Sequence, residues 1–231
     1  MRPIITRDRR LVVYESMGST QTHLAKLVRE GTCDVGAVVA LEQTEGRGRH
    51  GRFWYTPKGQ GLAVSWACFD YENWKKPELL GMSAALAVSL ALDTVLVWPN
   101  DLMLSLPEGR GEEALRKVGG VLCELVPSPR GSLVPVVGVG VNLSIEAFPE
   151  ELQGVATSFL LARGILLTWE EALQAIWGQW EFLPEPYSWQ DLAPYWLPRD
   201  RSAGKKYRLP TGQVGEAVGI TDEGWLLIEV N

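Results

Sequence analysis

Residues 46–52 (GRGRHGR) place three arginines within six positions and separate them with glycines. Forked guanidinium groups and bare backbone N–H groups are the donors that bind phosphate and carboxylate oxygens. Glycine also lets such a loop change shape when a ligand binds. The pattern therefore predicts an anion-binding loop. The alternative is a plain solvated loop, which would hold three like charges close together without an anion to offset their repulsion.

The same glycines match the G-x-G-x-x-G spacing of dinucleotide-binding loops, and Asp70 and Glu72 follow about 20 residues later. Such a loop must also open a helix whose N-terminus faces the pyrophosphate. Residues 53–57 (FWYTP) are aromatic and end in proline, so they do not supply that helix. A disordered arginine- and glycine-rich nucleic-acid tract is excluded too, because such tracts are repeated and this segment is single.

Three further clusters carry polar groups or glycines next to apolar runs. Residues 98–101 (WPND) place an amide and a carboxylate in a tight turn, which by itself is an ordinary Asx-type turn. Lys117 begins an apolar run, and Gly119 and Gly120 allow close approach to the backbone there. Considered without the other clusters, this lysine is typical of a solvated residue at the edge of a strand. Residues 138–142 (GVGVN) alternate small residues along a strand, which is typical of a ligand-binding surface or of tight strand packing.

Several kinds of active site find no support in the sequence. It has no G-x-S-x-G nucleophile elbow and no G-x-x-x-x-G-K-[ST] phosphate loop. Its two histidines are His23, which we expect on the surface of an amphipathic helix, and His50 in the arginine loop. Cys33, Cys68 and Cys123 form no C-x-x-C pair, so we expect buried free thiols rather than disulfides or a zinc site.

The properties of the whole chain narrow the class further. Its net charge of −6 argues against a general nucleic-acid binder, which usually carries a basic surface. The N-terminus lacks the apolar stretch of a secretory signal. The longest apolar run, residues 79–92, is shorter than the ~20 residues that span a bilayer. We therefore expect a cytoplasmic protein that binds neither DNA nor a membrane.

Alternating apolar runs and turn residues predict a mixed α/β fold that positions these clusters. Helices are predicted after a cap at Ser19 or Thr20, over the buried run 78–92, and after a capping box at Thr168. Residues 105–113 are predicted to form a polar surface loop. Strands are predicted from β-branched content and length at residues 11–15, 36–43, 62–69, 94–98, 102–106, 118–126 and 133–143.

Composition divides the chain near residue 198. We expect residues 1–198 to form the main domain and residues 199–231 to form a small C-terminal β-barrel domain. Prolines precede this boundary, and short strand patterns with a turn at residues 222–224 follow it. Roughly thirty residues are too few for an independent core, so this part should dock on the main domain.

Taken in order, the polar clusters resemble the biotin protein ligases (biotin–carboxyl-carrier-protein ligases). The resemblance implies a mixed β-sheet flanked by helices, the class II synthetase-like ligase fold, with a small C-terminal β-barrel. It covers the predicted main domain, and the β-rich tail is similar to the family's C-terminal domain. The matching segments are GSTQ at 18–21, EQTEGRGRHGRFW at 42–54, WPNDL at 98–102, KVGGVL at 117–122 and GVGVNL at 138–143.

This resemblance implies an enzyme that binds biotin, ATP and magnesium, forms biotinyl-5′-AMP, and passes biotin to a lysine of a biotin carboxyl carrier protein. The implied catalytic residues are Lys117, Arg47 and Arg49, which would offset repulsion between the biotin carboxylate and the α-phosphate. The implied biotin contacts are Ser19, Thr20, Gln43, Gly46, Arg47, Lys117, Gly119 and Gly120. The implied nucleotide contacts are Arg49, His50, Arg52, Trp54, Asn100, Asp101 and Asn142, and Asp101 and Asn142 are also the implied magnesium ligands.

The sequence departs from the family pattern in several places. Val97 stands where a lysine often precedes WPND, so a phosphate contact is lost there or replaced, for instance by an arginine of the loop. GSTQ at residues 18–21 replaces the usual DSTN, which alters the helix cap. The loop at residues 105–116 is longer than usual. About ten residues precede the first predicted strand, which leaves no room for the DNA-binding domain of some relatives and favours a monofunctional ligase.

Two alternatives stay open beside the biotin ligase. A lipoate or octanoate ligase shares the fold, and a non-catalytic biotin-binding module would agree with the missing lysine at Val97. Relatives are often homodimers, but no edge strand in the sequence can be assigned to such an interface.

Overall fold

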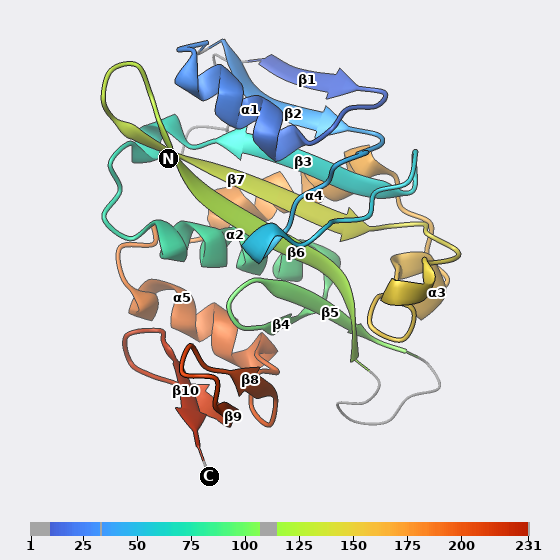
Figure 1. Ribbon diagram of the computed structural model, residues 1–231, viewed down its shortest axis with the longest axis vertical. Helices are drawn as coiled ribbons and strands as arrows, with labels where there is room; N and C mark the ends of the chain where they lie inside the picture. The colour runs from blue at the N-terminus through green and yellow to red at the C-terminus, as the bar shows by residue number, and fades with distance from the viewer. Residues whose placement is uncertain (1–9, 33, 107–114, 231) are drawn as a thin grey trace.

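The computed structural model describes residues 10–32, 34–106 and 115–230 (Figure 1). The main sheet has strands β1 (Arg10–Tyr14), β2 (Val35–Ala40), β3 (Gly61–Ala67), β4 (Val95–Val97), β5 (Asp101–Ser105), β6 (Leu115–Pro127) and β7 (Leu133–Asn142). Its seven strands lie in the order β1-β2-β3-β7-β6-β5-β4. The β1–β2 pair is parallel and the other pairs are antiparallel. The expected mixed sheet is confirmed. Most of the surface loop predicted at residues 105–113 lies outside the described residues.

In the described part of the chain, five α-helices accompany this sheet. They are α1 (Thr20–Arg29), α2 (Pro77–Leu92), α3 (Phe159–Arg163), α4 (Trp169–Phe182) and α5 (Trp189–Trp196). Ser19 caps α1 by accepting from Thr22 N at 3.4 Å, and Thr168 opens α4 with the predicted capping box. The predicted core helix is confirmed as α2, which is buried over most of its length. Among the described residues, no helix is both long enough and apolar enough to cross a membrane.

The alternation of side chains along each strand divides the core into two parts. On β7, Val137 and Val139 pack toward α2 and α4, whereas Val134 and Val136 pack toward α1. The first face is covered by α2, α4 and α5, while α1 covers only part of the second (Figure 1). The α1 face therefore leaves an uncovered surface over the later part of β7.

The C-terminal strands β8 (Lys206–Arg208), β9 (Val214–Ile220) and β10 (Leu226–Glu229) form an open three-stranded sheet in the order β10-β9-β8. The predicted small β-barrel is therefore corrected to an open sheet, because three short strands are too few to close on themselves. The sheet instead docks beside β4. Trp98 Nε1 donates to Gly224 O at 3.0 Å, and Arg201 N donates to Leu96 O at 2.7 Å. The division of the chain at residue 198 stays a prediction.

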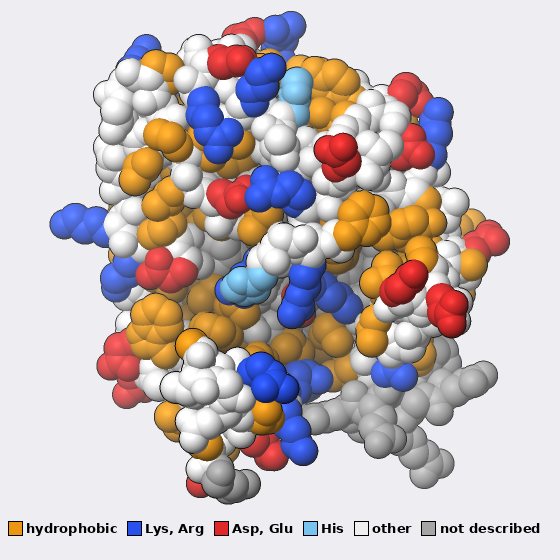
Figure 2. All heavy atoms as spheres, in the orientation of Figure 1, with side chains coloured by type: hydrophobic (Ala, Val, Ile, Leu, Met, Phe, Trp, Pro, Cys, Tyr) orange, Lys and Arg blue, Asp and Glu red, His pale blue; other side chains and the backbone are white. Residues whose placement is uncertain are grey.

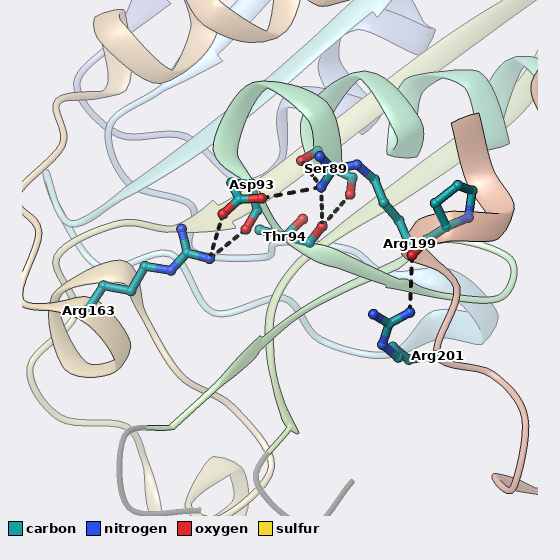
Figure 3. A network of polar contacts seen from close by, with 7 residues as sticks. Ser89, Asp93, Thr94, Arg163, Arg199 and Arg201 are labelled. Atoms are coloured by element: carbon teal, nitrogen blue, oxygen red, sulfur yellow. Dashed lines mark hydrogen bonds and ion pairs between the residues drawn. The ribbon is translucent and has the colours of Figure 1, made fainter. Parts of the chain in front are cut away.

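A polar network joins the end of α2 to α3 and to the route into the C-terminal sheet (Figure 3). Asp93 caps α2 in a left-handed conformation with φ of 49°. Arg199 Nη1 donates to Thr94 O at 3.0 Å and to Ser89 O at 3.3 Å, and Arg163 Nη2 donates to Asp93 O at 2.6 Å. Cations at a helix C-terminus satisfy carbonyls that the helix itself leaves unpaired.

Replacing Arg199 with methionine should lower the free energy of unfolding by about 1–2 kcal/mol, because two backbone carbonyls lose a charged donor. The ion pair with Asp93 adds little, since the Asp93 side chain is 77% exposed. Urea denaturation measures the change. Arg201→Met is the matched control: Arg201 is exposed, its guanidinium donates to the carbonyls of Pro198 and Asp200, and its backbone bond to Leu96 O is kept, so a change within about 0.5 kcal/mol is expected. Equal losses in both variants would contradict the assignment.

The cysteines differ in their surroundings. Cys68 is buried as expected, whereas Cys123 is a partly buried free thiol, and Cys33 lies outside the described residues. Burial, followed by the nearby carboxylates of Glu124 and Glu78, raises the pKa of the Cys123 thiol to about 12. The thiol therefore stays protonated at pH 8, and only the thiolate is nucleophilic. We expect iodoacetamide at pH 8 to leave Cys123 unmodified in the native protein and to label it in urea, as peptide mass spectrometry can check.

Candidate active site

A cleft of about 860 Å³ lies on the α1 face of the main sheet. It is bounded by α1, by the segment from Gln43 to Tyr55 that contains the arginine loop, and by the C-terminal sheet. Figure 2 shows it as a hollow with Lys and Arg side chains on its rims. The floor is formed largely by β6 and β7. The cleft thus lies over the part of the sheet surface that α1 leaves uncovered.

Three glycines on this floor make room for side chains of the cleft. A Cβ on Gly140 would lie 2.3 Å from Trp54 Nε1, and one on Gly138 would lie 2.6 Å from Gln21 Oε1. A Cβ on Gly120 would lie 3.3 Å from both Cε and Nζ of Lys117. The small residues predicted to border a ligand therefore border the side chains that line the cleft.

The end of the cleft beside α1 is a neutral polar network. Thr20 donates to Gln43 Oε1 through its backbone N at 2.9 Å and its Oγ1 at 3.1 Å. Ser65 Oγ lies 3.0 Å from Thr20 Oγ1 and donates to Gln21 Oε1 at 3.0 Å. All four side chains are buried. They offer donors and acceptors in fixed positions without a net charge.

The middle of the cleft carries three cations, each held by a partner. Lys117 Nζ donates to Asp101 Oδ1 at 2.6 Å and also lies 5.7 Å from the centre of the Trp54 ring. Arg49 Nη1 donates to Asn100 Oδ1 at 2.9 Å. The third cation, Arg47, pairs with Glu124 at 3.2 Å on β6. These contacts orient the cations, while Lys117 and Arg49 retain further N–H donors for a ligand.

Backbone hydrogen bonds join the two ends of the arginine loop. Trp54 N donates to Gly46 O at 2.8 Å, and Gly48 N donates to Arg52 O at 2.7 Å. At the tip, His50 adopts φ of 57° and is exposed. A Cβ on Gly46 would lie 2.2 Å from Trp54 O, so only glycine fits at the base. The loop is therefore a closed hairpin-like segment that presents its arginines to the cleft.

Most of the residues predicted for the site lie together in this cleft. Gly46 and Gly119 are buried and are not part of its lining, so their predicted contacts with biotin stay predictions. Asn142 is buried, and its Nδ2 donates to Thr157 O at 3.0 Å. The predicted residues that line the cleft are Ser19, Thr20, Gln43, Arg47, Arg49, His50, Arg52, Trp54, Asn100, Asp101, Lys117, Gly120 and Asn142.

The sequence reasoning missed several residues of the site. Gln21 and Ser65 belong to the neutral network, and Glu124 accepts from Gln21 Nε2 at 3.0 Å. A polar residue within an apolar strand, such as Ser65 in GLAVSWA, was the available signal. Lys206 and Tyr207 of the C-terminal sheet also line the cleft. No sequence signal marked them, because only the docking of that sheet brings them there.

Tyr207 shows how closely the C-terminal sheet approaches the site. Its hydroxyl donates to Trp98 O at 3.4 Å. Burial, and then the negative charges of Asp101 and Asp200, raise the pKa of Tyr207 to about 12. The phenol therefore stays neutral at physiological pH and places a hydrogen-bond donor beside the WPND turn.

A mixed sheet with a cleft that is neutral at one end and cationic in the middle suits a ligand that combines a neutral head group with anionic groups. Residues 13–142 match the biotin/lipoate A/B protein ligase family. The biotin–[acetyl-CoA-carboxylase] ligase of Mycobacterium tuberculosis is 32% identical over 246 residues, which cover 96% of this chain and 84% of that protein. The chain belongs to the biotin/lipoate A/B protein ligase family.

Two further relatives agree with this assignment. The bifunctional ligase/repressor BirA of Bacillus subtilis is 28% identical over 96% of this chain and 70% of its own length. The solved biotin protein ligase of Aquifex aeolicus, in complex with biotin and ATP, is 26% identical with a TM-score of 0.70, and the match covers 95% of this chain and 91% of that chain. The resemblance drawn from the sequence is confirmed, and so is the ligase fold that it implied.

Proposed function

We propose that this protein is a biotin protein ligase, which activates biotin with ATP and transfers it to a lysine of a carrier protein. The observation that carries the proposal is the change of chemistry along the cleft. A neutral hydrogen-bonding network lies beside α1, and the cations Arg47, Arg49 and Lys117 follow it. Biotin has a neutral ureido ring at one end and a carboxylate at the other, so it matches this gradient.

The neutral network suits the head group of biotin. Thr20, Gln43 and Ser65 are buried and hydrogen-bonded to one another, so their positions are fixed before a ligand arrives. A ureido group needs both donors and acceptors, and a pre-organised set binds it with little ordering cost. Ser19 borders the same end, where its side chain caps α1.

The cations suit the first chemical step. An oxygen of the biotin carboxylate attacks the α-phosphorus of ATP, and pyrophosphate leaves with its bonding electrons. Two anions must approach each other, so fixed cationic donors lower the barrier most. We assign Lys117 to the carboxylate and α-phosphate oxygens, with Asp101 holding its ammonium group at 2.6 Å. Arg47 and Arg49 stabilise the charge on the phosphates.

The second step requires no nucleophile from this chain. The amine of the carrier lysine attacks the acyl carbon of biotinyl-AMP, and AMP leaves as an amide bond forms. We propose a biotin carboxyl carrier protein as the acceptor and the cytoplasm, where ATP is available, as the place of reaction. A homodimer stays a proposal as well.

Magnesium would assist by neutralising the phosphates of ATP. It usually binds to one or two protein carboxylates together with substrate phosphates. Among the described residues, no three His, Cys, Asp or Glu side chains gather as a metal site. Asp101 lines the cleft and fits the role of the single carboxylate. Asn142 uses its amide N–H toward Thr157, which leaves its carbonyl oxygen to face a cation.

Exchange of labelled pyrophosphate into ATP tests the activation step. We expect exchange to depend on biotin, and mass spectrometry should then detect one biotinyl group on a carrier domain incubated with the enzyme, ATP and biotin. Exchange with lipoate or octanoate but not with biotin would replace the proposal by a lipoate-type ligase. Binding of biotin without any exchange or transfer would favour the non-catalytic module.

A further inference from the structure

The carboxylate of Glu124 lies between the arginine loop and the neutral network. Glu124 is on β6, outside the lining of the cleft. Its Oε1 accepts from Arg47 Nη2 at 3.2 Å, and its Oε2 accepts from Gln21 Nε2 at 3.0 Å. One side chain that does not face the cleft is therefore bonded to both parts of the site at once.

The two partners of Glu124 both donate, so this position requires a carboxylate. A guanidinium group has donors only. The amide of Gln21 is held in one orientation, because its Nε2 also donates to Val136 O at 3.1 Å and its Oε1 accepts from Ser65 Oγ at 3.0 Å. A glutamine at position 124 would offer one oxygen to two donors, and its own NH2 group would face the donor left over.

Gln21 transmits the position of Glu124 into the buried network. The Gln21 side chain is buried, and a Cβ on Gly138 would lie only 2.6 Å from its Oε1, so the backbone of β7 runs directly against it. Ser65, which donates to Gln21, has its hydroxyl 3.0 Å from that of Thr20. A shift of the Gln21 amide must therefore move the hydroxyl groups at the neutral end of the cleft.

Arg47 ties the loop to the main domain through its side chain. The backbone bonds of the loop join its own two ends, whereas Arg47 reaches outside it: Nη1 donates to Thr22 Oγ1 at 3.4 Å on α1, and Nη2 donates to Glu124 on β6. The guanidinium group keeps further N–H donors for a ligand. The Arg47 and Glu124 side chains are 45% and 33% exposed, so their pair adds little to global stability. Its consequence is where the loop lies.

We propose that Glu124 is a positioning residue that joins the arginine loop to the neutral network. This inference rests on the proposed function. The head group and the carboxylate of biotin are parts of one molecule, so the cation that meets the carboxylate must lie at a fixed distance from the network that holds the head group. Glu124 fixes that distance without touching a substrate, because it acts through Arg47 and Gln21.

Trypsin measures the link without any substrate. Trypsin cleaves after arginine, so each arginine of the loop is a site, and the exposed Arg130 in the turn between β6 and β7 is an internal reference. We expect Glu124→Gln to speed cleavage in the loop about threefold to fivefold, the range that a partly exposed ion pair supports. Cleavage after Arg130 should not change. Glu30→Gln is the matched control, because Glu30 is exposed, lies outside the cleft lining and pairs with Lys26 at 3.8 Å.

Pyrophosphate exchange measures the consequence for the reaction. We expect Glu124→Gln to lower kcat/KM for biotin about tenfold, since two donors lose a charged acceptor. The double variant Arg47→Met, Glu124→Gln should lose at least about threefold less than the product of the two single losses, because residues that act through one another are not additive. Glu30→Gln should exchange at the wild-type rate.

Loop cleavage at the wild-type rate in Glu124→Gln would overturn the inference. Equal acceleration in the loop and after Arg130 would also overturn it, since that result indicates a general loosening of the fold, and so would losses that simply multiply in the double variant. The proposed function fails separately, when the wild-type protein shows no biotin-dependent exchange. In that case the trypsin comparison still decides whether Glu124 holds the loop.

Discussion

Replacing Lys117 with methionine should reduce biotin-dependent pyrophosphate exchange by roughly a thousandfold, the scale of losing one oriented donor to a developing charge. Its ammonium group is the cation held by Asp101 at 2.6 Å, and its stem runs over Gly120. Methionine keeps a similar length and removes only the charge and the donors. The exchange rate, measured with saturating ATP and biotin, gives the effect directly.

The fold should survive this substitution. Lys117 and Asp101 have side chains that are 34% and 33% exposed, so water can solvate the carboxylate once its partner is gone. Thermal unfolding of the variant should therefore match wild type within a few degrees. Lys26→Met is the matched control, because Lys26 is an exposed lysine of α1 with only a 3.8 Å pair to Glu30. Exchange at the wild-type rate in Lys117→Met would show that the catalytic role lies elsewhere.

Replacing Gly46 with alanine should reduce exchange by about a hundredfold, because displacement of a substrate-positioning loop by about 1 Å has effects of that size. The new Cβ would lie 2.2 Å from the backbone oxygen of Trp54, and no rotation of a side chain relieves that contact. The base of the loop must open, and Arg47 and Arg49 move with it. The exchange assay and the KM for ATP measure the loss.

Gly48→Ala provides a control within the same loop. Its Cβ would come no closer than 3.5 Å to Arg52 O, and Gly48 has φ of −109°, which alanine adopts readily. Near-wild-type exchange is expected. If both alanine variants lost activity equally, the loss would reflect reduced loop flexibility rather than the contact at the base.

The sequence predicted the strands of the main sheet and the helices α1, α2 and α4 because their signals are local, whereas it did not predict α3 and α5. The β-branched run that became β2 is buried on both faces, and the apolar run 79–92 is enclosed as α2. A capping box needs only Thr168 and Glu171, so the start of α4 could also be predicted. The barrel prediction failed for the opposite reason. Three short strands are too few to close, so their place is set by the surface on which they dock, and that surface includes β4, about a hundred residues earlier in the chain.

The candidate site likewise has residues that the sequence identified and partner residues that it did not. Residue type and spacing identified the arginine loop, the WPND turn, Lys117 and the GVGVN strand, since each cluster is contiguous in the sequence. Their partners are not contiguous. Glu124, Ser65 and Gln21 meet the predicted residues only because β3, β6 and α1 lie side by side around β7.

The sequence by itself thus determined the residue types that line the cleft: cations suited to an anionic ligand and glycines that allow close approach. The tertiary structure alone decided how the cleft runs, from a neutral network at α1 past the cations to the C-terminal sheet beside β4. It also placed Lys206 and Tyr207 in the lining of that cleft. Side-chain type is a local property of the chain, whereas the distance between residues far apart in sequence is set only by how the elements pack.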